Sequence, residues 1–132
     1  FESLRRLDLR NNGLISVPNS LAISLPQLHE LRLQDNAISC LPDNISDLMQ
    51  LKVLLLQRNC LEALPPALYR LKALEQLNVA ANSIRAVSAA IEDLARLTSL
   101  DLSGNALAAL PETIANLAAL QFFDASDNEA AD

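Results

Sequence analysis

The chain has 132 residues, the length of one domain, and its 51% hydrophobic content is enough for a sizeable core. Only 3% of the residues are aromatic, so this core must be built from aliphatic side chains, as in a stack of many copies of one small unit. The net charge of −6 argues against nucleic acid as a partner, and no apolar run approaches the roughly 18 to 20 residues needed for membrane insertion.

One pattern recurs along the chain with a period of 23 or 24 residues. It is clearest in LKVLLLQRNCLEALPPALYRL at 51–71, which reads L-x-x-L-x-L-x-x-N-x-L-x-x-L-P and continues with apolar residues at every third position. Copies begin near residues 4, 28, 51, 74 and 97, and a partial copy begins at 120. An asparagine returns at the same place in each copy, at Asn12, Asn36, Asn59, Asn82, Asn105 and Asn128. This regularity predicts a stack of repeats in which no copy folds alone.

Each copy is expected to form a short strand, a turn and a helical turn, in that order. In the strand predicted over 53–56, Leu54 and Leu56 point into the core, whereas Val53 and Leu55 point to the opposite face. The asparagine that follows is expected to satisfy backbone groups inside the turn and to stack on the next one. We therefore assign the six asparagines a structural role and no binding role.

The returning segment of each copy is expected to begin at a proline. Pro65 is suited to the first position of a helical turn, and Asp43 and Glu112 follow their own prolines, where a carboxylate favours the start of a helix. The fourth copy has Ser88 instead of proline, which predicts a looser or more extended segment there. The first copy has one extra residue in SLAISLPQL at 20–28.

This pattern resembles the leucine-rich repeat family across nearly the whole chain. The segments CLPDNISDLMQL (40–51) and ALPETIANLAAL (109–120) are similar to its intracellular, Ras-suppressor and Scribble-like class. The resemblance implies an α/β fold over 1–132: a right-handed solenoid with a parallel concave sheet, short convex helices or helical turns, and about five full repeats plus partial ends. Because the pattern is open at both ends, we expect the chain to be a piece of a longer protein.

Residues suited to catalysis are scarce. The one histidine, His29, is interpreted as an exposed residue at the rim, and the two glycines, Gly13 and Gly104, lie in turns and not in a phosphate-binding loop. We predict no enzyme activity, no cofactor and no metal site. Cys40 and Cys60 occupy different places in their copies, which favours reduced thiols over a disulfide.

Residues that the repeat does not dictate lie along the outer face of each predicted strand. They run from mixed charge through an apolar centre to an acidic end, and residues 61–132 hold four Lys or Arg against ten Asp or Glu. Such a gradient would orient a charged partner. The predicted partner-binding residues are Arg6, Asp8, Arg10, Glu30, Arg32, Gln34, Val53, Leu55, Gln57, Arg58, Gln76, Asn78, Asp101, Phe122 and Asp124.

These observations predict a protein–protein interaction module of a scaffold or signalling protein, with a protein partner on the concave face. One alternative is a structural subunit or spacer packed along its convex side, where Met49, Tyr69 and Arg70 would matter more. Another is a targeting domain attached to a kinase, GTPase, phosphatase or ubiquitin ligase. A cytoplasmic location is favoured by the lone cysteines, whereas the glycosylation triplet at 44–46 keeps an extracellular location open. The oligomeric state stays open.

Overall fold

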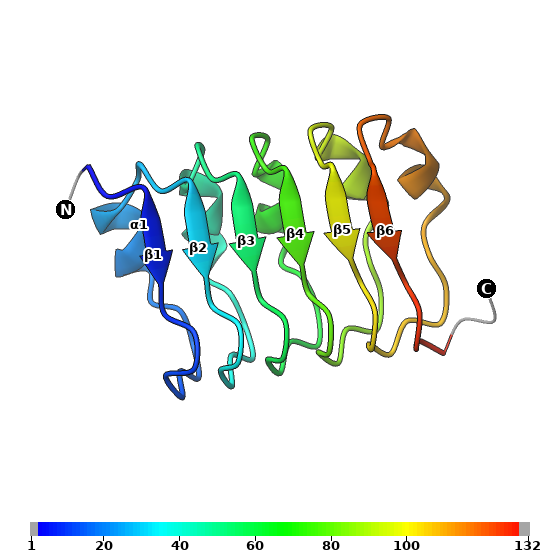
Figure 1. Cartoon of the computed structure of the whole chain (residues 1–132), viewed down its shortest axis with the longest axis horizontal. Helices are drawn as coiled ribbons and strands as arrows, with labels where there is room; N and C mark the ends of the chain where they lie inside the picture. The colour runs from blue at the N-terminus through cyan, green and yellow to red at the C-terminus, as the bar shows by residue number, and fades with distance from the viewer. Residues whose placement is uncertain (1–2, 130–132) are drawn as a thin grey trace.

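The computed structural model describes residues 3–129, which form one sheet of six short strands (Figure 1). The strands are β1 (Arg6–Asp8), β2 (Glu30–Arg32), β3 (Val53–Leu55), β4 (Gln76–Asn78), β5 (Ser99–Asp101) and β6 (Phe122–Asp124). Between them lie the helix α1 (Ser20–Ser24) and the 3₁₀ turns η1 (Asp43–Asp47), η2 (Pro66–Arg70), η3 (Ala89–Asp93) and η4 (Glu112–Asn116). The strands follow one another in chain order across the sheet.

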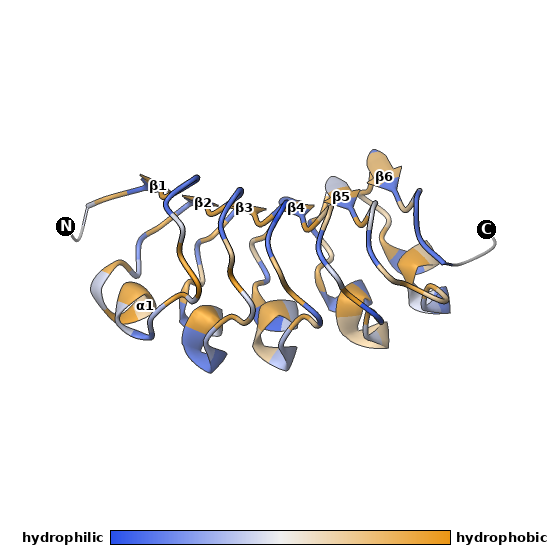
Figure 2. Cartoon of the chain, turned by 90° about the horizontal axis from the view of Figure 1, so that it is seen from below, coloured by the Kyte–Doolittle hydropathy of each residue, from blue (hydrophilic) through white to orange (hydrophobic). Residues whose placement is uncertain are grey.

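The register of the sheet follows the repeat. Leu31, Leu54, Leu77 and Leu100 pair in parallel across neighbouring strands, so equal positions of successive repeats form columns. The strands lie on the inner side of a shallow arc and the helical turns on its outer side (Figure 2). The predicted leucine-rich repeat solenoid is therefore confirmed.

The core lies between the sheet and the helical turns. Leu54 and Leu56 are 0% exposed, while Val53 and Leu55 of the same segment are half-buried on the opposite face. Leu68 of η2, also 0% exposed, closes the core from the convex side. Because side chains alternate along a strand, one apolar run supplies both the core and the centre of the concave face.

The asparagines after the strands bond each repeat to the one before it. Asn59 Nδ2 donates to the carbonyls of Leu33 (2.9 Å) and Leu56 (3.0 Å), and its Oδ1 accepts from the Ile38 N–H (3.0 Å). Four others make the equivalent bonds to their own and the preceding repeat: Asn36, Asn82, Asn105 and Asn128. The Asn12 amide donates within its own copy.

Two expectations for the start of the helical turns are wrong. Pro65 lies before its turn in extended backbone (φ −67°, ψ 151°), and η2 begins at Pro66. Ser88 neither loosens nor extends the fourth repeat, since it has the same conformation (φ −66°, ψ 150°) and precedes an equally long turn. Its hydroxyl oxygen accepts a hydrogen bond from the Ala90 N–H (3.0 Å), so a serine cap replaces the proline ring in setting the start of η3.

The extra residue of the first repeat changes its helical turn. In α1 the Leu25 N–H donates to the Leu21 carbonyl four residues earlier (2.9 Å), whereas after η1 the Leu48 N–H donates to the Ile45 carbonyl three residues earlier (3.1 Å). The added residue therefore converts a 3₁₀ turn into one turn of α-helix, and the sheet register is unaffected.

Tyr69 is buried, at 5% exposed, so the expectation that it offers a convex contact is wrong. Its hydroxyl oxygen accepts a hydrogen bond from the Ser88 N–H (3.1 Å), a donor that the prolines at the equivalent positions lack. Burial raises the pKa of the Tyr69 phenol, and the Ser88 hydrogen bond opposes part of this shift.

A Tyr69→Phe variant is expected to lose about 1 kcal/mol of stability at neutral pH, because the Ser88 N–H loses its acceptor. The pKa of Tyr69 is higher in the folded state than the unfolded value near 10. The neutral phenol therefore contributes its full share of the free energy of unfolding below the unfolded pKa, and this share is lost as pH rises through the folded pKa. Urea unfolding should show the difference between the two proteins shrinking above about pH 10. The chain has one Tyr and no Trp, so phenolate absorbance follows this group alone. A constant difference up to about pH 11 would contradict the burial argument.

The six asparagines that follow the strands are called the asparagine ladder below. The residue before each of them has left-handed backbone. In the fourth repeat it is Ala81 (φ 55°), and in the fifth it is Gly104 (φ 65°). Because a Cβ is strained in this conformation, Ala81→Gly is expected to raise the free energy of unfolding by about 1 kcal/mol. The reverse change Gly104→Ala should lower it by at least as much, since its Cβ would lie 3.4 Å from the Ala81 nitrogen. Urea unfolding measures both changes, and shifts of the same sign would contradict this account.

Candidate functional site

The concave face is the side of the sheet that points away from the core. Residues at equal positions of successive strands form columns on this face, and neighbouring residues within a column are about 4.8 Å apart. The first column is Arg6, Glu30, Val53, Gln76, Ser99 and Phe122. The second is Asp8, Arg32, Leu55, Asn78, Asp101 and Asp124. A third position follows each strand, at Arg10, Gln34, Gln57, Ala80, Ser103 and Ser126.

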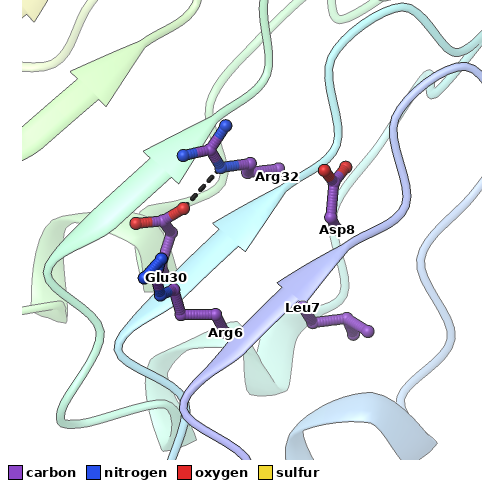
Figure 3. Close-up of a pocket in the computed structure, with 5 residues that line it drawn as sticks. All are labelled: Arg6, Leu7, Asp8, Glu30 and Arg32. Atoms are coloured by element: carbon purple, nitrogen blue, oxygen red, sulfur yellow. Dashed lines mark hydrogen bonds and ion pairs between the residues drawn. The ribbon is translucent and has the colours of Figure 1, made fainter.

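Except for Arg6, the charged side chains at β1 and β2 are paired within their own repeats. Arg10 Nε lies 3.2 Å from Asp8 Oδ2, and the Arg32 guanidinium donates to Glu30, which raises the pKa of Arg32 through this hydrogen bond and its charge. Some of these side chains, together with Arg6, surround a shallow hollow of about 300 Å³ (Figure 3). Its lining residues are Arg6, Leu7, Asp8, Glu30 and Arg32. The hollow presents both signs of charge, so it does not select an acidic partner by charge alone.

An ion pair also joins the second repeat to the third. Arg58 Nη2 donates to Asp35 Oδ2 (2.9 Å), and Arg58 Nε bonds to the other oxygen. The Arg58 hydrogen bond holds the pKa of Asp35 below its ordinary value, and Asp35 raises the pKa of Arg58. The end of the concave face that looks basic in sequence is therefore largely neutralised by its own carboxylates.

Apolar and amide side chains occupy the centre of the concave face. Val53 and Leu55 are half-buried, so part of each side chain faces solvent. Gln34 is 6% exposed and Gln57 is half-buried, and they hold equal positions in adjacent repeats. The Oε1 atoms of both glutamines are buried and have no hydrogen-bond partner within residues 3–129.

The second column also ends the strands, a role that the sequence reasoning missed. Asp101 Oδ1 accepts hydrogen bonds from the N–H (3.0 Å) and hydroxyl (2.6 Å) of Ser103, and Asp124 Oδ1 does the same with Ser126 (2.9 and 2.7 Å). These bonds lower the pKa of Asp124. Asn78 Oδ1 accepts from the N–H two residues later (3.0 Å) in the same way. The recurring D-x-S pattern is the signal that could have revealed this role.

The remaining predicted side chains of this face are Gln76 and Phe122, both exposed in the first column. Phe122, at 51% exposed, is the largest apolar group that the described residues place there. The sheet thus brings all fifteen predicted residues to one face or to the turn beside it. It also separates them into a charge-paired end at β1 and β2, an apolar and amide centre, and a polar and acidic end.

Other residues with possible chemistry lie apart from this face. His29 is half-buried, and its Nε2 lies 3.2 Å from Gln50 Oε1. Cys40 and Cys60 are free and exposed. No three His, Cys, Asp or Glu side chains within residues 3–129 are grouped so that they could hold a metal ion. In the same part of the chain no helix has the length and apolar character to cross a membrane.

Comparisons with known proteins agree with the fold. The family model described as leucine rich repeat matches residues 2–61 and 49–107. No curated protein matches. Among solved structures, a leucine-rich repeat protein of Leptospira interrogans is 29% identical over 98% of this chain, with a TM-score of 0.84.

Two plant receptor structures are similarly close. The Arabidopsis receptor kinase HAESA, solved in complex with the peptide hormone IDA and the co-receptor SERK1, is 32% identical over 97% of the chain, with a TM-score of 0.85. The leucine-rich repeat ectodomain of the Arabidopsis thaliana receptor kinase GASSHO1/SCHENGEN3, in complex with CASPARIAN STRIP INTEGRITY FACTOR 2, is 32% identical over 96%, also with a TM-score of 0.85. The chain spans only 38%, 22% and 16% of the lengths of these three structures.

Proposed function

Because the chain belongs to the leucine rich repeat family, whose domains typically bind proteins and are generally not enzymes, we propose that it is a protein-recognition module that binds its partner on the concave face. The observation that carries this proposal is the half-buried pair Val53 and Leu55 at the centre of the concave face, between its charge-paired end and its acidic end. Apolar side chains ringed by polar ones are typical of the centre of a binding surface.

The surroundings of this pair support the proposal. The outward-facing side chains of the strands on either side are not required by the core, so they can be adapted to a partner without disturbing the fold. The HAESA structure contains a similar solenoid in complex with a peptide hormone and a co-receptor, which supports a peptide or protein ligand here. Six strands about 4.8 Å apart span only about 25 Å, so a standard interface of about 800 Å² per partner would also use the turns or further repeats.

We further propose that the module serves a scaffold or signalling protein in the cytoplasm. Cys40 and Cys60 support a reducing compartment, because both thiols are free and exposed. The triplet at 44–46 supports glycosylation only weakly. The Asn44 Nδ2 donates to the Asn19 carbonyl (2.8 Å) and its Oδ1 is buried, so the folded amide is occupied by the protein itself.

A double variant, Val53→Ser with Leu55→Ser, tests the concave site. We expect it to fold with little loss of stability, since both side chains are half-buried and neither enters the core, and to bind the partner at least tenfold more weakly. The partner is first isolated by crosslinking and affinity capture with the parent protein. Calorimetric titration of the purified pair then gives both affinities. Unchanged affinity with an intact circular dichroism spectrum would refute the concave site.

The matched control lies on the convex side and tests the alternative role. Ile23 and Met49 are 71% and 74% exposed, which favours a structural subunit packed along the helical turns as the second candidate. The double variant Ile23→Ser with Met49→Ser makes a comparable apolar-to-polar change there. It should leave affinity unchanged if the concave face binds the partner. Loss of affinity in this control alone would support the structural role.

A further inference from the structure

The concave face has few charged hydrogen-bond donors free for a partner. Three of its arginines are paired with carboxylates of the same face: Arg10 with Asp8, Arg32 with Glu30, and Arg58 with Asp35. Within residues 3–129, Arg6 at the first strand is the remaining concave arginine, and no ion pair holds it. A ligand that needs many donors, such as an acidic segment, would have to break existing ion pairs.

Acceptors on the same face are left over. Gln34 is only 6% exposed, and its Oε1 has no hydrogen-bond partner among the described residues 3–129, nor has the Oε1 of Gln57 in the next repeat. An amide oxygen buried without a partner is unfavourable, and the group gains free energy when a donor reaches it. The terminal torsion of glutamine is soft and roughly two-fold, so each amide group can turn over and present its oxygen to an incoming donor.

The acidic end adds two carboxylate oxygens. Asp101 and Asp124 are neighbours in the sheet register, and the bonds to Ser103 and Ser126 use only their Oδ1 atoms. Each Oδ2 has no hydrogen-bond partner within residues 3–129, so both retain acceptor capacity. This is a second group of acceptors, independent of the glutamine pair.

We propose, on the basis of the concave binding role above, that the partner presents a lysine-rich segment. One ammonium group donates to the amide oxygens of Gln34 and Gln57, and another to the carboxylates of Asp101 and Asp124. An ammonium carries three donors and no acceptor, which matches these free amide and carboxylate oxygens. The aliphatic stem of a lysine packs against apolar side chains, here Leu55. The net charge of −6 also favours the approach of a cationic segment.

The test is an NMR titration of the ¹⁵N-labelled protein with two synthetic probes at low ionic strength. One is an alternating lysine–alanine octapeptide, and the other is its glutamate–alanine counterpart. The lysine peptide should shift the side-chain amide signals of Gln34 and Gln57 and the backbone signals of Asp101 and Asp124, and the shifts should weaken with salt. The glutamate peptide should leave these signals in place.

Charge variants show whether the acceptors themselves matter. Asp101→Asn with Asp124→Asn removes two charges but keeps the strand ends, because Asn78 already makes the equivalent hydrogen bond from the same column. This variant should weaken lysine-peptide binding several-fold. The matched control, Asp93→Asn with Glu112→Gln, removes the same charge from exposed convex residues and should have no effect. Gln34→Leu with Gln57→Leu should also weaken binding several-fold without loss of stability.

The outcomes separate this inference from the proposed function. If the lysine peptide shifts convex signals as much as concave ones, its attraction to the protein is general and the inference is wrong. The same holds if the concave and the convex charge variants weaken binding of the lysine peptide equally. If the glutamate peptide binds the concave face instead, the inference is wrong but concave recognition stands. If neither peptide binds while Val53→Ser with Leu55→Ser still weakens the natural partner, the inference fails alone. If that double variant has no effect either, both proposals fail.

Discussion

Replacement of Asn59 with alanine is expected to lower the free energy of unfolding by about 2 to 5 kcal/mol, more than any surface change in this chain. The Ile38 N–H loses the acceptor that Asn59 Oδ1 provides, and a buried donor without a partner costs about 1 to 3 kcal/mol. The carbonyls of Leu33 and Leu56 lose one bond each but keep a second, from Asn36 and Asn82. Sharing between successive asparagines therefore limits the loss.

The chain contains its own control for this prediction. Asn12 is exposed, and its amide donates only to carbonyls of its own repeat, so Asn12→Ala should cost less than about 1 kcal/mol. The isosteric Asn59→Asp keeps an acceptor for Ile38 but loses the two donors and places a negative charge near two carbonyls. It should be as damaging as alanine at neutral pH. Urea unfolding of the three variants ranks their losses in free energy of unfolding. Equal losses at Asn12 and Asn59 would show that the asparagine ladder is not a source of stability.

The sequence predicts the architecture of this chain well because its period is visible. Leucines in an L-x-x-L-x-L arrangement define which side chains of a three-residue strand enter the core, and the same register returns in all six strands. Each repeat must bury the same apolar positions against the same kind of neighbour, so the strands of all repeats adopt the same backbone arrangement. The structure follows this rule even where the sequence departs from it, since Ser88 takes over the place of proline with the same backbone conformation.

Side-chain pairing on the concave face could not be predicted in the same way. The pattern shows that Arg58 lies outside the core, but the choice of Asp35 as its partner depends on how adjacent repeats stack. The strand-ending bonds of Asp101 and Asp124 likewise depend on the geometry of the turn that follows each strand. The hydrogen bond of the Tyr69 hydroxyl depends on a single donor, the Ser88 N–H, in the next repeat. Each of these contacts depends on one particular pair of residues and not on the period.

Leu54→Ala is the second variant with a large expected effect, about 3 to 5 kcal/mol, because it removes a fully buried side chain and leaves a cavity. Leu54 packs in a column between Leu31 and Leu77, which are 0% and 1% exposed, so structure on both sides resists collapse into the space. Leu7→Ala removes the same atoms from the same position of the first repeat, where the side chain is only half-buried. That loss should be about 1 to 2 kcal/mol.

The two leucine variants should also differ in how they unfold. In a solenoid each repeat contacts only its neighbours, so a weak repeat in the middle uncouples the two halves, whereas a weak repeat at the end shortens the folded array. Leu54→Ala should broaden the urea transition and lower its slope, and hydrogen exchange should speed up on both sides of β3. Leu7→Ala should speed exchange only near β1. Equal losses and equal exchange patterns at the two sites would mean that the chain unfolds as a single unit, and stacking between neighbouring repeats would then not set its stability.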